Sequence, residues 1–269
     1  SKFYRVNMLT TINVGENGTA LKILRNVIGH GPNGYSQSQY KAIIRYLNEV
    51  SSFKNCWEKI WSDTRLRFGI KPSGLAINYT LPVLKKIKGR ILWDLGAGTG
   101  RDSVFLSKHC EQVTCVEMTG TAASDIKEQI IDKKISNIEI INDDVWSALK
   151  MQNNARSGFV DVIHAHSFLH YTKPIMTEVI FLEMHQLLKK NGRLVFAVKG
   201  KGDHLYGKGK QIGKDDWIFE DGQRRTFYDE ESISKVLNKA GFEVEFLKTK
   251  REFFDNMPSE FVIGIACKI

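Results

Sequence analysis

A glycine-rich stretch in the middle of the chain carries the pattern best suited to binding a ligand. The run Ile91–Leu95 reads as a buried strand with Asp94 near its end, and glycines follow at positions 96, 98 and 100. Glycine tolerates positive φ and has no side chain to block a ligand. Helix-forming sequence begins at Arg101, so the turn lies at a helix N-terminus, where unpaired N–H groups and a partial positive charge attract polar ligands.

The spacing of these glycines argues against two common nucleotide sites. A dinucleotide-binding turn needs one more residue between the second and third glycines, and the lysine of a phosphate-binding P-loop is absent. Acidic residues do follow the next two predicted strands, at Glu117 and at Asp143 with Asp144. A carboxylate at Glu117 can accept hydrogen bonds from both hydroxyls of a ribose. Ligands of open α/β sheets bind beyond the carboxyl ends of strands, so these acids predict one common site.

The elements that must position these residues alternate between strand and helix from Gly89 onward. The predicted strands are Ile91–Leu95, Val113–Glu117, Ile138–Ile141, Val160–His164 and Arg193–Val198, with helices at Thr121–Lys134 and Pro174–Lys190. This alternation predicts a parallel sheet covered on both faces. Near the end, Asp229 caps a helix that continues to Ala240. Two closing strands then follow at Phe242–Leu247 and Glu260–Lys268.

The residues before Gly89 read as helical. Apolar side chains recur at helical spacing in three stretches, Leu21–Ile28, Tyr40–Leu47 and Phe53–Trp61, and a further helix is expected over Gly74–Ile87. We therefore expect a helical N-terminal extension at residues 1–88 and an α/β core at residues 89–269.

The strand and turn from Ile91 to Gly100, together with the ordered acids, resemble the signatures of class I S-adenosylmethionine-dependent methyltransferases. The sequence Gly98–Ser103 resembles the small-molecule subgroup that includes the tellurite-resistance and thiopurine types. The resemblance covers roughly Gly89 to the C-terminus. It implies a Rossmann-like, doubly wound, mostly parallel sheet with a C-terminal antiparallel hairpin. It also implies S-adenosylmethionine as the cofactor, with S-adenosylhomocysteine as its product.

By this resemblance the cofactor lies on the turn and at the strand ends that follow. Asp144 aligns more naturally than Asp143 with the acid that accepts from the adenine amino group. N-terminal helices cover the cofactor in such enzymes, so Trp61 and Arg67 are expected to close over the methionine moiety. Packing of Trp61 in the core is the alternative. The expected cofactor residues are Asp94, Gly96, Ala97, Gly98, Gly100, Arg101, Glu117, Met118, Asp144, Val145, His166, Trp61 and Arg67.

The candidate catalytic residues follow the fourth predicted strand. Methyl transfer from a sulfonium needs alignment and desolvation more than acid–base groups, and a base helps only when the attacking atom starts protonated. His166 is the first candidate base, with His170 and Tyr171 as further candidates. Two interpretations compete. His164, His166 and His170 could form a metal site, but we expect none because a strand end and a helix separate them. Alternatively, His170 and Tyr171 only pack against the sheet.

The loop Lys199–Lys210 combines glycines with a local run of lysines after the fifth predicted strand. We expect a mobile lid that binds an anionic group of the substrate. The residues expected to do so are Tyr206, Lys208, Arg224 and Arg225. A flexible, solvated loop is the alternative, because charge runs usually have that meaning.

Composition narrows the class of protein. No apolar run approaches the ~18 residues that cross a bilayer, and the first residues lack the apolar core of a secretion signal. The 4 cysteines show no disulfide-like or Cys-x-x-Cys spacing, so a cytoplasmic location is expected. The net charge of +9 permits nucleic-acid partners, although the basic residues are mostly scattered.

These observations predict a methyltransferase that acts on a small molecule, anionic if the lid binds as expected, at an undetermined N, O, S or C atom. An RNA-modifying methyltransferase is a second hypothesis. It is favoured by the net charge, but the sequence has neither an appended RNA-binding module nor an Asn/Asp-Pro-Pro-Tyr/Phe tetrapeptide. A third hypothesis is a cofactor-binding subunit without activity, and a fourth is a related enzyme that uses the same cofactor for different chemistry. No membrane partner is expected, and the oligomeric state is not predicted.

Overall fold

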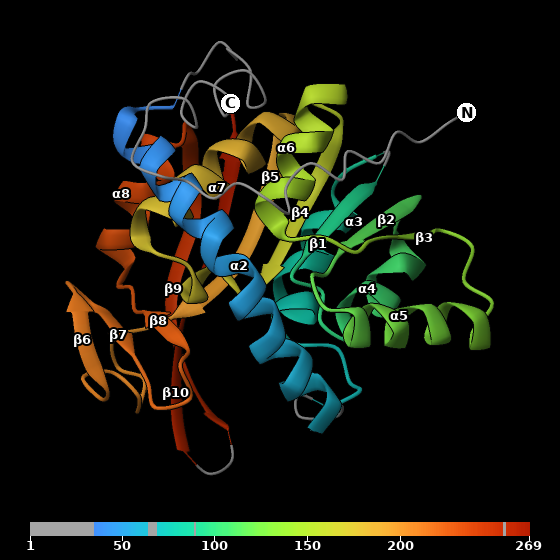
Figure 1. Ribbon diagram of the computed structural model, residues 1–269. Helices are drawn as coiled ribbons and strands as arrows, with labels where there is room; N and C mark the ends of the chain where they lie inside the picture. The colour runs from blue at the N-terminus through green and yellow to red at the C-terminus, as the bar shows by residue number, and fades with distance from the viewer. Residues whose placement is uncertain (1–34, 64–68, 89, 255–256) are drawn as a thin grey trace.

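The computed structural model describes residues 35–63, 69–88, 90–254 and 257–269. Its centre is a seven-stranded sheet with the order β3-β2-β1-β4-β5-β10-β9 (Figure 1). The strands are β1 (Ile91–Leu95), β2 (Gln112–Val116), β3 (Ile138–Ile141), β4 (Val160–His166), β5 (Leu188–Lys199), β9 (Phe242–Phe254) and β10 (Met257–Lys268).

The direction of the strands confirms the predicted doubly wound sheet. Strands β1 to β5 pair in parallel, and β10 runs antiparallel to both β5 and β9. Four of the five residues of β1 are buried, as expected for a strand covered on both faces. Several boundaries differ from prediction; β9, for example, continues to Phe254 instead of ending at Leu247. The helix expected to reach Lys190 ends at Leu187, and β5 begins at the next residue, with Asn191 in the left-handed conformation.

Helices cover both faces of the sheet (Figure 1). One face carries α6 (Val145–Ala155), α7 (Pro174–Leu187) and α8 (Glu230–Lys239). The other carries the π-helical turn η1 (Ala76–Thr80), α3 (Leu81–Lys85), α4 (Arg101–Leu106) and α5 (Gly120–Asp132). Two short 3₁₀ turns, η2 (Ser107–His109) and η3 (Leu169–Tyr171), complete the helical segments.

Helix α2 (Gln37–Asp63) crosses the molecule as one continuous 27-residue helix (Figure 1). Its first turns pack into the core through Tyr40 and Ile43. Its last turns reach α5, where the carboxylate of Glu58 accepts hydrogen bonds from the backbone N–H groups of Gly120 (2.6 Å) and Thr121 (3.1 Å). The helix expected at residues 21–28 lies outside the described residues.

A second, three-stranded antiparallel sheet was not predicted from the sequence. It consists of β6 (Lys210–Gly213), β7 (Asp216–Ile218) and β8 (Arg224–Thr226), in that order. Its strands are only three or four residues long, and β6 is exposed along its whole length, so no alternating apolar pattern marks it. The hydroxyl of Thr226 on β8 donates to the carbonyl of Thr172 (3.1 Å) and attaches the small sheet to the rest of the fold.

The residues just before the expected boundary at Gly89 share a core with the main sheet. Leu75, Ala76 and Leu84 pack with Leu92 of β1 and Leu106 of α4 in one apolar cluster. The expected division between an N-terminal extension and the α/β core at residue 88 therefore remains a prediction. No helix among the described residues is both long and apolar enough to cross a membrane.

We predict that Glu58→Ala lowers the free energy of unfolding by about 1 kcal/mol, measured by urea denaturation. The substitution leaves two N–H groups at the start of α5 without an acceptor, as in the loss of a helix cap. Burial alone would raise the pKa of Glu58, but these N–H groups lower it, so the contribution is lost as the pH falls through that lowered value. Glu49→Ala is the control on the same helix, because its exposed pair with Lys173 is worth about 0.5 kcal/mol or less. Equal losses in the two variants would contradict the capping role.

Candidate active site

A cavity of about 1390 Å³ opens where the strands β1, β2 and β4 end. It extends from the glycine turn to β5, β10 and the small sheet, beneath α2. Pockets for one small ligand usually have about 300–1,000 Å³. The cavity therefore has room for two ligands side by side.

The glycine turn between β1 and α4 forms one end of this cavity. Gly96 and Gly98 have φ of +69° and +55°, and both line the cavity together with Ala97 and Arg101. A Cβ on Gly96 would lie 2.9 Å from Phe168, and one on Gly98 would lie 3.1 Å from Trp61. Gly100 serves packing instead, since it does not line the cavity and a Cβ there would lie 2.8 Å from Ile126.

Glu117 lies at the end of β2 and lines the cavity together with Met118. Its carboxylate accepts hydrogen bonds from the backbone N–H of Gly98 (2.9 Å) and from both the N–H and the hydroxyl of Thr119 (2.9 and 2.7 Å). Burial raises the pKa of Glu117, and these hydrogen bonds oppose the shift. The carboxylate is thus held rigidly beside the glycine turn.

Two of the predicted acids do not line the cavity. Asp94 is buried beneath the turn and accepts a hydrogen bond from the Ser103 hydroxyl, and burial raises its pKa to about 6. Asp144 caps α6 by accepting from the N–H of Ser147 (3.1 Å). Its neighbours do reach the cavity: Val145 lines it, and so does Tyr46 of α2, whose pKa is raised by burial and by the nearby Asp144.

A buried ion pair supports the floor of the site. The carboxylate of Asp102, at the start of α4, lies 3.1 Å from Nε2 of His164 on β4, and Nδ1 of His164 lies 2.8 Å from the Thr80 hydroxyl. Asp102 also accepts from the N–H and the hydroxyl of Ser73, both at 2.6 Å. His164 therefore has a structural role, and sequence reasoning missed Asp102 and Ser73 because their partners are distant in the chain.

The three candidate catalytic residues have different surroundings. His166 lines the cavity with a side chain that is 25 % exposed, and burial lowers its pKa to about 4. His170 is 1 % exposed, its Nδ1 has no hydrogen-bond partner among the described residues, and burial holds its pKa well below the usual value. Tyr171 lines the cavity and packs against His170, with ring centroids 4.4 Å apart. His166 is thus the imidazole best placed to meet a ligand.

Aromatic residues of α2 cover the cavity. Trp61, Trp57 and Phe53 lie on one face of the helix and all line it. Trp57 meets Tyr171 edge-on, with ring centroids 5.1 Å apart. The sequence pattern marked all three as one helical face and selected only Trp61 as a cofactor residue, because burial against a core and burial against a ligand look alike in sequence. Arg67 lies outside the described residues.

The predicted lid is only partly at the cavity. Lys208 and Arg225 line it, whereas Tyr206 and Arg224 do not. The Tyr206 hydroxyl donates to Asp215 (2.7 Å), and Arg224 is paired with Asp216, so neither is directed at a substrate. The segment is also more ordered than a solvated loop, because its last residue begins β6 and the chain continues into β7 and β8.

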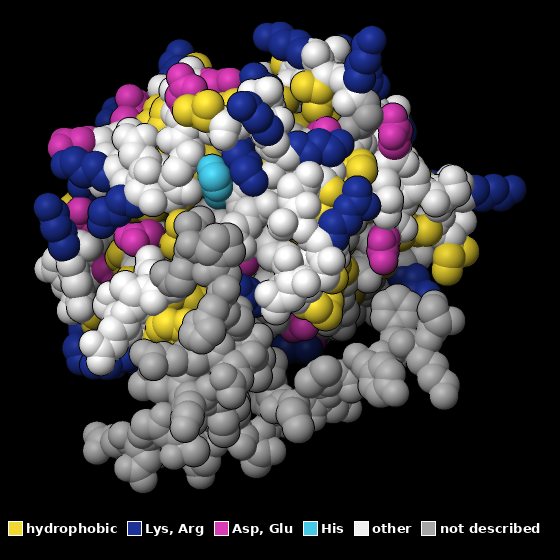
Figure 2. Space-filling view, turned by 90° about the horizontal axis from the view of Figure 1, so that it is seen from above, with side chains coloured by type: hydrophobic (Ala, Val, Ile, Leu, Met, Phe, Trp, Pro, Cys, Tyr) yellow, Lys and Arg dark blue, Asp and Glu magenta, His cyan; other side chains and the backbone are white. Residues whose placement is uncertain are grey.

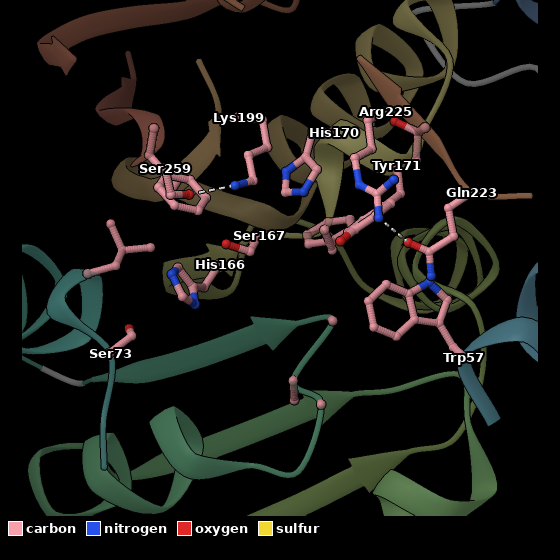
Figure 3. A pocket seen from close by; sticks show the side chains of 18 of the residues that line it. Trp57, Ser73, His166, Ser167, His170, Tyr171, Lys199, Gln223, Arg225 and Ser259 are labelled. Carbon is pink, nitrogen blue, oxygen red and sulfur yellow. Dashed lines mark hydrogen bonds between the residues drawn. The ribbon is translucent and has the colours of Figure 1, made fainter. Parts of the chain in front are cut away.

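Figure 3 shows further residues at the cavity that sequence reasoning did not select, among them Ser167, Lys199, Gln223 and Ser259. Lys199 ends β5 and donates to Asp203 and Ser259, both at 2.6 Å. Gln223 accepts from Arg225 (2.8 Å). Lys199 follows an apolar strand, so its place at a strand end was the one available signal.

The sequence matches a family model described as a methyltransferase domain over residues 65–246. No functionally curated protein matches it significantly.

Solved structures of the same fold include three methyltransferase-like proteins of low sequence identity. One is a 1,6-didemethyltoxoflavin-N1-methyltransferase from Burkholderia thailandensis, with 1,6-didemethyltoxoflavin and S-adenosylhomocysteine bound. It has a TM-score of 0.56 and 16% identity, over 88% of this chain and 92% of that one. A phosphoethanolamine N-methyltransferase from Haemonchus contortus has a TM-score of 0.59 and 15% identity, over 80% and 60% of the two chains. TehB from Haemophilus influenzae has a TM-score of 0.55 and 14% identity, over 71% and 62%.

We predict that Asp102→Asn lowers the free energy of unfolding by about 3–5 kcal/mol, because it leaves His164 buried without its charged partner. Burial disfavours the charged forms of both side chains. Their interaction with each other outweighs burial, lowering the pKa of Asp102 and raising that of His164. The stabilisation of the folded protein by this ion pair is therefore fully present between pH 3.8 and 6.5. It is lost as the pH rises through the raised pKa of His164.

The measurement is urea unfolding of both proteins at a series of pH values above 6.5. The wild type should lose stability over this range, and Asp102→Asn should lose much less. Parallel pH profiles of the two proteins would contradict the ion pair.

Proposed function

Because this chain belongs to the methyltransferase domain family, whose class I members use S-adenosylmethionine, we propose that it methylates a small molecule enclosed in the cavity. The observation that carries the proposal is the shape of the cavity, which begins at the glycine turn and continues past His166 to the small sheet. One half can take a cofactor and the other an acceptor. The cover formed by α2 favours a small acceptor over a polymer, which needs an open groove.

The residues at the glycine turn fit S-adenosylmethionine. Gly96 and Gly98 leave space that a Cβ would fill, and Glu117 lies beside them with its carboxylate fixed by Gly98 and Thr119. We assign the ribose hydroxyls to Glu117, the methionine end to Ala97, Gly98 and Trp61, and the adenine end to Val145. When bound, the cofactor supplies a methyl group activated by its sulfonium charge.

Residues of this chain would align the acceptor and exclude water. Trp57 and Trp61 close the cavity from above, which lowers the local dielectric and favours a displacement between fixed partners. His166 is neutral at physiological pH because burial lowers its pKa, so its imidazole can accept a proton from an acceptor hydroxyl or ammonium group. Tyr171 can orient the acceptor, while His170, which also lines the cavity, packs against the ring of Tyr171.

The proposal is tested by titration calorimetry of the intact protein with S-adenosylhomocysteine. We expect binding, and we expect Glu117→Gln to weaken it by ten- to a hundredfold, since the hydrogen bonds of a buried carboxylate are worth about 1.5–3 kcal/mol. Glu139→Gln, an exposed change on the neighbouring strand β3, is the control. No binding by the folded wild type, or equal binding by both variants, would contradict the assigned cofactor site.

The role of His166 is tested with labelled methyl groups once an acceptor is known. His166→Ala should lower kcat by about 10²-fold if its imidazole accepts the proton. With an acceptor that does not titrate, kcat/KM should stay level on acidification and fall only as the pH approaches 4, where His166 becomes protonated. An acid limb near pH 6.5 that persists in His166→Ala would assign the titration to another group.

A further inference from the structure

Two walls of different chemistry face each other across the half of the cavity away from the glycine turn. Figure 3 shows Trp57, Tyr171, Arg225 and Gln223 on one side and His166, Lys199 and Ser259 on the other, with Ser167 between them. We call this space the acceptor slot. It is the part of the cavity that the cofactor assignment leaves for the second ligand.

The first wall is built from stacked π systems. The Arg225 guanidinium lies 4.5 Å from the centroid of the Phe219 ring and 5.7 Å from that of Tyr171. Trp57 meets the same tyrosine edge-on, which fixes the orientation of its ring. A guanidinium, an indole and two phenyl-type rings all present flat faces that interact well with another flat ring.

The second wall is also aromatic beneath its polar atoms. Phe261 of β10 lies beside His166, with ring centroids 6.4 Å apart and planes inclined by only 31°. The Lys199 ammonium lies 4.5 Å above the Phe261 ring. Aromatic groups on both walls favour a planar ligand, which can pack against flat faces, over a branched or saturated one.

Two cations of the slot, Lys199 and Arg225, are already paired with carboxylates. Lys199 is 2.6 Å from Asp203, a residue that is itself buried. Arg225 is 3.2 Å from Asp221 and also donates to Gln223. A phosphate or a dicarboxylate would have to compete with these acids. Lys199 and Arg225 therefore add little unpaired positive charge to the slot.

Ser167 places a hydroxyl at the centre of the slot. Its backbone is left-handed, with φ of +61°, a conformation disfavoured for a residue with a Cβ, and its N–H is held by the carbonyl of Ala197 (3.2 Å). The hydroxyl makes no hydrogen bond to any other residue that the structure describes. Such conformations persist where the surrounding structure enforces them, often at ligand sites.

We infer that the acceptor is a flat, conjugated ring without a multiply charged group, bound between Tyr171 and Phe261, with a polar substituent hydrogen-bonded to Ser167. This inference rests on the proposed function, and it names the class of acceptor. A hydroxyl or ring nitrogen on such a molecule would meet Ser167 and His166 together.

The experiment is titration calorimetry with three probes on protein saturated with S-adenosylhomocysteine. The probes are 2-naphthol, its saturated counterpart decahydro-2-naphthol, and phosphoethanolamine. The first two share a hydroxyl and a carbon skeleton but differ in planarity, and the third is an aliphatic anion. We expect 2-naphthol to bind at least fivefold more tightly than the saturated alcohol, and phosphoethanolamine to bind more weakly than either.

Matched variants locate the binding. Tyr171→Leu should weaken 2-naphthol three- to tenfold, the usual value of an aromatic contact, and should leave the affinity for S-adenosylhomocysteine within twofold. Tyr206→Leu makes the same change at a tyrosine outside the slot and should leave 2-naphthol binding unchanged. Ser167→Ala removes a hydrogen bond to the hydroxyl and no aromatic contact, so the two alcohols should lose affinity by the same factor.

Equal affinity for the flat and saturated alcohols, tighter binding of phosphoethanolamine, or no binding of 2-naphthol would each overturn the inference. Failure of the proposed function gives a different result. The folded protein would then not bind S-adenosylhomocysteine, and 2-naphthol titrated alone into wild type and Tyr171→Leu would still decide the nature of the slot.

Discussion

The turn between β1 and α4 has no room for a Cβ, and three other elements depend on that. The segment after β4 approaches Gly96 through Phe168, helix α2 approaches Gly98 through Trp61, and helix α5 packs on Gly100 through Ile126. The glycines therefore serve binding and packing at once. Helix α2, the segment after β4 and helix α5 can each pack this closely only because the turn carries no side chains at these three positions.

Around this turn, charges are buried only where they are paired or hydrogen-bonded. Asp102 has His164 and Ser73, Glu117 has Gly98 and Thr119, and Lys199 has Asp203. Burial of an unpaired charge costs several kcal/mol of folding free energy, so each of these groups is stable in the interior only with its partner beside it. The surface is organised differently: on the face in Figure 2, basic side chains lie dispersed among acidic ones rather than in a single stripe. The net charge of +9 therefore marks no track for a nucleic acid on that face.

The sequence predicted the main sheet and the family, because buried strands and a glycine turn leave local signals, and several of the residues that it selected line the cavity. Glu117 could be found from its position after an apolar strand. Asp94 and Asp144 share that pattern, yet one turns beneath the sheet edge and the other caps a helix. The same limit applies to Arg224 and Arg225. They are adjacent in sequence, but successive residues of a strand point to opposite faces, so β8 directs only Arg225 into the cavity. The short strands around them have no pattern long enough to predict.

Helix α2 is anchored near both of its ends. Tyr35, just before it, is hydrogen-bonded to the buried Glu183, and Glu58 near its far end is held by α5. A helix fastened in this way cannot swing aside cheaply to admit a ligand. The cavity instead reaches the surface beside Ile70 and Met257, two exposed side chains on its lining. The anchored cover therefore leaves ligands to enter from the side, past Ile70 and Met257, rather than through a movement of α2.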